Sequence, residues 1–113
     1  MAKIMSSSEQ IKMMKAIHGA ATTAGTPILV NSRLCVPINT ALINVENLFA
    51  DDVPALEINK EAPLVISGGD TVYWDDGAKK VTKTAQGNTK CGMAVEDAAS
   101  ADTVAYIHLM RQV

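Results

Sequence analysis

Residues 68–92 read GGDTVYWDDGAKKVTKTAQGNTKCG, and this stretch decides the fold. Two runs of β-forming residues, 71–75 and 80–84, flank Asp76-Gly77. Asp-Gly between such runs is a strong short-range signal for a β-hairpin. The stretch contains no recognisable catalytic, metal-binding or phosphate-binding motif, so its patterning specifies shape. We therefore expect a protein that acts by fitting against a partner.

Short apolar runs separated by turn signals continue this β pattern on both sides of the hairpin. Residues 28–30 and 33–38 flank a predicted tight turn at Asn31-Ser32, and residues 51–54 (DDVP) predict another turn. Residues 103–109 alternate, with Val104, Tyr106 and His108 on one face of the predicted strand. The pattern predicts a mainly β fold, a compact small β sandwich or barrel with at most short helical turns. A short helix within residues 40–49 and a single helical turn within residues 97–102 remain open.

Composition favours a single domain with apolar surface available for a partner. The chain has 113 residues, of which 48% are apolar, 19% charged and only 4% aromatic. The charged fraction is below the roughly 25% typical of soluble proteins. Apolar surface that the core does not use is free to contact another protein or copies of the same chain. The alternative is an ordinary alanine-rich globular domain.

Charge and terminal composition argue against several functional classes. The formal net charge is −2, from 10 Lys and Arg against 12 Asp and Glu, whereas dedicated nucleic-acid binders are strongly basic. The local cluster of Lys79, Lys80, Lys83 and Lys90 is interpreted as a solvated hairpin face. No run approaches the ~18 apolar residues of a membrane span. The N-terminus lacks the apolar region of a signal peptide, which predicts synthesis and use in the cytoplasm without export.

Catalytic and metal-binding constellations are absent from the sequence pattern. The histidines, His18 and His108, have no Cys or carboxylate at ligand spacing, so both are expected to be structural. The acidic pairs at 51–52 and 75–76 lack the spacing of a calcium loop and are interpreted as solvated turn residues. Cys35 and Cys91 are expected to be buried free thiols, with a disulfide as the alternative. We therefore predict no enzyme activity, no cofactor and no metal.

The N-terminal segment, residues 1–24, fits either a helix or a strand. Ser6 and Glu9 have capping-box spacing, whereas Ile11, Met13 and Ile17 share one face of an alternating strand that only Lys15 interrupts. We predict an N-terminal arm over residues 1–24, followed by a β-rich domain over 25–113. The arm is a candidate for ordering on a neighbouring molecule. Its candidate contact residues are apolar: Ile4, Met5, Ile11, Met13, Met14 and Ile17.

Tyr73 and Trp74 complete the set of candidate interaction residues. They are adjacent, so on a strand they face opposite sides, one toward the core and the other outward. The outward ring is a candidate interface anchor, because Trp and Tyr are enriched at binding hot spots. Together with the lysine cluster, these rings define the alternative hypothesis of a small β-barrel nucleic-acid-binding module.

The same region resembles a known family, the small capsid cement (decoration) proteins of tailed bacteriophages, long catalogued as a phage domain of unknown function. The similarity is strongest in the C-terminal half, extends upstream to about Gly25, and is weaker at residues 24–30 and 57–60. The motifs that resemble the family are GDTVYWD (69–75), KVTKTAQGNT (80–89), GMAV (92–95) and AASADTV (98–104). Unlike the family, this chain has no glycine within residues 39–54, so the strand connections of its middle third stay open.

The resemblance implies a structural virion protein located on the outer capsid surface. Such a protein binds the assembled head, bridges subunits of the major capsid protein and stabilises the shell. It also implies a homo-oligomer, with a trimer favoured over a dimer, and no nucleic-acid or membrane partner. A phage tail or connector component is the structural alternative. No catalytic residue is implied by the matching motifs.

Overall fold

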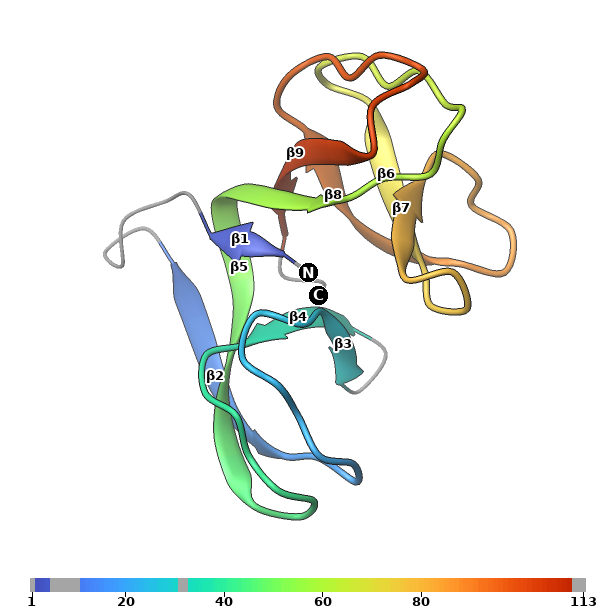
Figure 1. Cartoon of the computed structure of the whole chain (residues 1–113). Helices are drawn as coiled ribbons and strands as arrows, with labels where there is room; N and C mark the ends of the chain where they lie inside the picture. Colours follow the sequence, from blue (N-terminus) through green and yellow to red (C-terminus); the bar gives the residue numbers. More distant parts are fainter. Residues whose placement is uncertain (1, 5–10, 31–32, 111–113) are drawn as a thin grey trace.

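The computed structural model describes residues 2–4, 11–30 and 33–110. Within these ranges the chain forms nine β-strands and no helix (Figure 1). The sheet curls into a half-barrel, which confirms the predicted mainly β fold. The strands are β1 (Lys3–Ile4), β2 (Lys12–Ile17), β3 (Ile28–Val30), β4 (Arg33–Pro37), β5 (Glu46–Asn59), β6 (Thr71–Asp75), β7 (Lys80–Thr82), β8 (Thr89–Ala94) and β9 (Val104–Leu109).

Strand β5 is shared by the two lobes visible in Figure 1. Its first half, residues 46–52, pairs antiparallel with β2, and Phe49 and Ala50 also pair with β4 on the other edge. Its second half pairs with β9 on one edge and with β1 on the other. The path through the sheet is β3-β4-β5-β9-β8-β6-β7. One 14-residue strand therefore connects the lower lobe to the upper lobe.

A bulge within β5 changes which side chains of the strand point inward. The register against β9 shifts between Val53 and Leu56, and Pro54, which has no N–H to donate, lies in this interval. Val53 before the bulge and Leu56 and Ile58 after it are all buried in the same hydrophobic cluster, although a regular alternation would place Val53 and Leu56 on opposite faces. The phase shift therefore keeps both sides of the bulge in one cluster, while Phe49 belongs to a second, smaller one.

The two clusters differ in size and in the strands that build them. The smaller one consists of Val30, Cys35 and Phe49, with Met14, Ala16 and Ile28 packed against it. The larger one is centred on Trp74 and the second half of β5. Its fully buried members include Val53, Leu56, Ile58, Ile66, Val72, Val81, Ile107 and Leu109. Because β2 covers the smaller cluster, residues 12–17 contribute to packing within the chain.

The structure settles three points that the sequence left open, and it confirms the alternation of β9. Residues 12–17 form a strand, and its outward positions are Met13, Lys15 and Ile17. β9 alternates as expected, with Ala105, Ile107 and Leu109 buried. Residues 97–102 form a loop, and the connection before β5 contains no helix among the described residues. The predicted turn at residues 31–32 lies outside the described residues.

The predicted turn at residues 51–54 is wrong, because these residues lie within β5. Asp51 is 1% exposed, and its carboxylate lies 3.6 Å from the Arg33 guanidinium of β4. Asp52 points to the other side, where its carboxylate is 3.2 Å from Nε2 of His108. Both carboxylates therefore contact a side chain of a neighbouring strand, and Asp51 is buried rather than solvated as expected.

Gly92 lies where β8 pairs antiparallel with β9, and the two backbones approach too closely there for any side chain. A Cβ atom built on Gly92 would collide with the backbone carbonyl oxygen of His108. We expect Gly92→Ala to lower the free energy of unfolding by at least about 2 kcal/mol, since neither backbone can move without breaking the ladder. Urea unfolding followed by the fluorescence of the single tryptophan measures this change. Gly19→Ala is the matched control, because its Cβ meets nothing within 4 Å. Equal stability of the two variants would contradict the proposed crowding.

Both cysteines are buried and neither forms a disulfide, as expected. Burial raises the pKa of the Cys91 thiol to about 12 from the ordinary 9.0, so the reactive thiolate is scarce at neutral pH. We predict that neither thiol reacts with a disulfide reagent such as DTNB at pH 8 in the native protein, whereas both react in denaturant. Rapid labelling of a native thiol would show that one of these sites opens to solvent.

Candidate functional site

Exposed apolar side chains gather at two places on the surface. The first, which we call the apolar tip, consists of Ile17, Leu42, Ile43 and Val45, where β2 ends and β5 begins. The second, which we call the sheet face, lies on the outward side of β6, β8 and β9. It consists of Tyr73, Met93, Val95 and Tyr106. The two surfaces lie beside opposite halves of β5.

The apolar tip is built from two segments held together by backbone hydrogen bonds. Ile17 pairs with Glu46 at the end of the β2–β5 ladder. The Asn44 amide donates to the His18 carbonyl oxygen at 3.0 Å, and the Val45 amide closes a turn on the Leu42 carbonyl oxygen at 3.2 Å. Asn44 adopts φ 60°, a left-handed conformation that Asn tolerates better than most residues. The turn therefore projects Leu42 and Ile43 outward.

A buried amide fixes the base of the tip. Asn47 is 6% exposed, and its Nδ2 donates to the Thr22 hydroxyl at 3.1 Å and to the Asn39 carbonyl oxygen. Thr22 and Ala41 exchange backbone hydrogen bonds of 2.9 and 3.0 Å. The side-chain oxygen Oδ1 of Asn47 in turn accepts a hydrogen bond from the backbone amide of Leu48 at 2.8 Å. These contacts tie both loops of the tip to the first half of β5.

The sequence segments that form the tip contain almost no charged residues. Between residues 16 and 45 the only Asp, Glu, Lys or Arg is Arg33, which lies in β4 beside Asp51. The boundary of the tip is marked by Lys15 on β2 and Glu46 on β5, both exposed. Exposed aliphatic residues that are close in the fold and bounded by charged ones are candidates for an interaction site.

The sheet face combines apolar side chains with one polar pair, Tyr106 and Glu57. Met93 lies opposite His108, and the Val95 amide donates to the Tyr106 carbonyl oxygen at 2.9 Å. The Tyr106 hydroxyl lies 3.3 Å from the Glu57 carboxylate, whose negative charge raises the pKa of Tyr106. A shallow depression lined by Ala55, Val95, Glu96 and Tyr106 opens beside these residues. This surface is therefore more polar than the tip.

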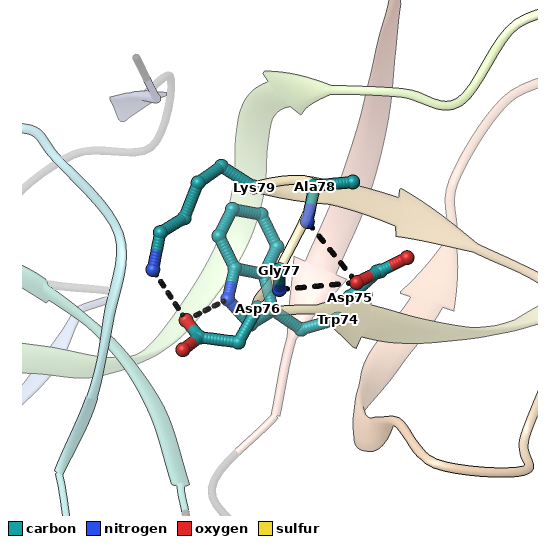
Figure 2. Close-up of polar contacts among 6 residues, drawn as sticks. All are labelled: Trp74, Asp75, Asp76, Gly77, Ala78 and Lys79. Carbon is teal, nitrogen blue, oxygen red and sulfur yellow. Dashed lines mark hydrogen bonds and ion pairs between the residues drawn. The ribbon is translucent and has the colours of Figure 1, made fainter.

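The hairpin around Trp74 is organised by two aspartates, as Figure 2 shows. Asp76 Oδ1 accepts from the Trp74 indole N–H at 3.1 Å and from the Lys79 ammonium at 2.8 Å. Asp75 Oδ1 accepts from the amides of Gly77 and Ala78, both at 3.1 Å. The hydrogen bond to Lys79, and then that to Trp74, lower the pKa of the Asp76 carboxyl. The predicted hairpin is confirmed, and its polar groups are engaged in holding the turn.

The described residues contain no arrangement suited to metal binding. No group of three or more His, Cys, Asp or Glu side chains converges within them. Nor does any helix there have the length and apolar character needed to cross a membrane. Of the lysine cluster, Lys79 pairs with Asp76, and Lys83 lies 3.4 Å from the Asp70 carboxylate.

Comparison with known proteins agrees with this description. A family model described as phage cement protein matches residues 7–109, nearly the whole chain. The chain belongs to the phage cement protein family. Membership indicates a capsid-stabilising structural role and a location on the virion capsid. No curated protein and no solved structure shows a significant match to the chain.

In this cement protein the candidate contact residues of the N-terminal segment separate into two groups. Met13 and Ile17 are 43% and 64% exposed, so both are available to a partner. Met14 turns inward against the smaller cluster, and Ile4 and Ile11 are half-buried against the larger one. Met5 lies outside the described residues. Among these residues, only Ile17 belongs to the apolar tip.

The aromatic pair of the cement protein also separates as the strand pattern predicts. Trp74 is 2% exposed in the main core, whereas Tyr73 is half-buried on the sheet face. The outward ring is therefore Tyr73. Sequence reasoning did not single out Leu42, Ile43 and Val45 as contact residues. The uncharged stretch in which they lie is the signal that could have identified them.

The Asp76 contacts predict a pH-dependent stability for the cement protein. We expect Asp76→Ala to destabilise it by about 0.5–1 kcal/mol at pH 7, because the indole N–H loses its acceptor while the half-exposed site stays solvated. A carboxyl whose pKa is lowered on folding stabilises the folded state at pH values above its ordinary pKa. This contribution is lost as the pH falls through the folded-state pKa. The difference from the parent should therefore shrink below about pH 4. Urea unfolding at a series of pH values measures it, with Glu96→Ala as the surface control. A difference that stays constant with pH would contradict this assignment.

Proposed function

We propose that this protein binds the outer surface of the phage head and bridges neighbouring subunits of the major capsid protein, thereby stabilising the shell. The observation that most supports the proposal is the cement-family match over residues 7–109. The absence of a converging metal-ligand cluster within residues 2–4, 11–30 and 33–110 is compatible with a role that depends on shape.

The arrangement of surfaces suits a bridging protein. The apolar tip adjoins the start of β5, and the sheet face adjoins its second half, so the molecule offers separate contacts at two places. Its longest extent is 38 Å. A protein with two separated contacts can hold two subunits, and the same modest contact repeated over a shell sums to tight attachment.

Within this proposal, the outward residues of the predicted arm and of the hairpin belong to the contact surface. Met13 and Ile17 of β2 and Tyr73 of β6 are the exposed or half-exposed members of the candidate set. Ile4, Ile11, Met14 and Trp74 support these strands from within. The protein acts as a homo-oligomer, a trimer in preference to a dimer, and joins the capsid after synthesis in the host cytoplasm.

Cosedimentation with purified heads that lack the protein tests this function. We expect saturable binding and a higher temperature of head disruption when the protein is bound, since a ligand stabilises the state that it binds. Light scattering after gel filtration should give three times the 12.0 kDa chain mass. Binding to tails or connectors with none to heads would refute the cement function in favour of the alternative.

A further inference from the structure

One row of side chains crosses the sheet face and ends at a carboxylate. The Val95 amide donates to the Tyr106 carbonyl oxygen at 2.9 Å, and Tyr106 is the register partner of Glu57 on β5. Opposite residues of neighbouring antiparallel strands share a face of the sheet, so these three side chains lie side by side. Val95 is 48% exposed, and Glu96, which follows it, is exposed as well. The row is therefore open to a partner at its Val95 end.

The depression beside this row has aliphatic and aromatic walls. It is lined by Ala55, Val95 and Tyr106 together with Glu96. The Tyr106 hydroxyl donates to the Glu57 carboxylate at 3.3 Å, a contact that helps to orient the ring before a partner arrives. Apolar walls of this kind accommodate the methylene stem of a lysine or arginine side chain, and the face of an aromatic ring attracts its cationic end.

The charges that surround the depression are negative. The charge of Glu57 is the largest cause of the raised pKa of Tyr106, and the charges of Glu96 and Asp102 raise it further. Lys3 of β1 is the other register partner of Glu57, on the side away from Tyr106. A basic group that enters the depression is therefore attracted, whereas an acidic group is repelled.

Charge complementarity decides which kind of partner fits this surface. A second copy that docked through the same face about a twofold axis would place Glu96 against an identical acidic surface. Like charges that face each other across an interface oppose binding. The phosphates of a nucleic acid would be repelled for the same reason. A different protein that presents a lysine or an arginine meets neither objection.

We propose that the depression of the sheet face receives a lysine or arginine side chain of the major capsid protein. This inference rests on the proposed head-binding function and assigns the chemistry of one contact. The aliphatic stem packs on Val95 and Tyr106, and the cationic end meets the carboxylates of Glu57 and Glu96. Because this contact is close to solvent, added salt should weaken the binding of the parent protein to heads.

Two substitutions of opposite charge at one position test the proposal. In cosedimentation with purified heads, Val95→Lys should bind at least about tenfold more weakly than Val95→Glu, because the new ammonium opposes the cation of the partner. Gln86→Lys and Gln86→Glu are the matched controls and should bind alike. Gln86 is exposed on the loop before β8, whereas Val95 follows the other end of that strand. Glu96→Lys is a second test variant and should repeat the loss if Val95→Lys fails to fold.

Each remaining outcome overturns the proposal in a distinguishable way. If both Val95 variants weaken binding equally, the contact is apolar and no cation enters the depression. If both bind as the parent does, the sheet face is not a docking surface and the head-binding function stands. If the Gln86 variants differ as much as the Val95 variants, the charge of the whole head surface explains the effect. If Val95→Lys changes the mass in solution, the depression joins copies of this chain. If the parent itself does not bind heads, the proposed function fails and this inference fails with it.

Discussion

The whole structure depends on hydrogen bonding along both edges of β5. This strand receives β2 and β4 on its first half and β1 and β9 on its second, so segments from residue 3 to residue 109 meet on one backbone. The bulge around Pro54 keeps Val53, which precedes it, and Leu56, which follows it, in the same hydrophobic cluster. Without the bulge, a regular alternation would send one of these two side chains to the opposite face.

Local patterns in the sequence were sufficient for the elements that rest on short-range physics. The Asp76-Gly77 hairpin, the alternation of β9 and the outward positions of β2 follow from turn chemistry and a period of two, and the structure has all three. Residues 51–54 could not be assigned this way. Their strand conformation depends on Arg33 and His108, which are distant in sequence and close only after folding. The tip was missed for a similar reason, since Ile17 meets the start of β5 only through the β2–β5 ladder, where it pairs with Glu46.

The division of tasks between the hairpin and the tip follows from how each satisfies its polar groups. In the hairpin, Asp75, Asp76 and Lys79 use their side chains to hold the turn, so this segment is fixed by its own charges. In the tip, a buried amide and the backbone perform that task, which leaves the outward positions free for aliphatic residues. The hairpin, by which the family is most easily recognised, is thus distinct from the apolar tip.

The path of β5 also has a mechanical consequence. The tip and the sheet face are joined by this one strand, so a force that separates whatever they hold is directed along its axis. Hydrogen bonds in an antiparallel sheet run perpendicular to the strands. A pull along β5 therefore loads the bonds to β2, β4, β1 and β9 together, in shear, and they must yield as a group. In the proposed bridging role, the ladder as a whole would resist such a pull.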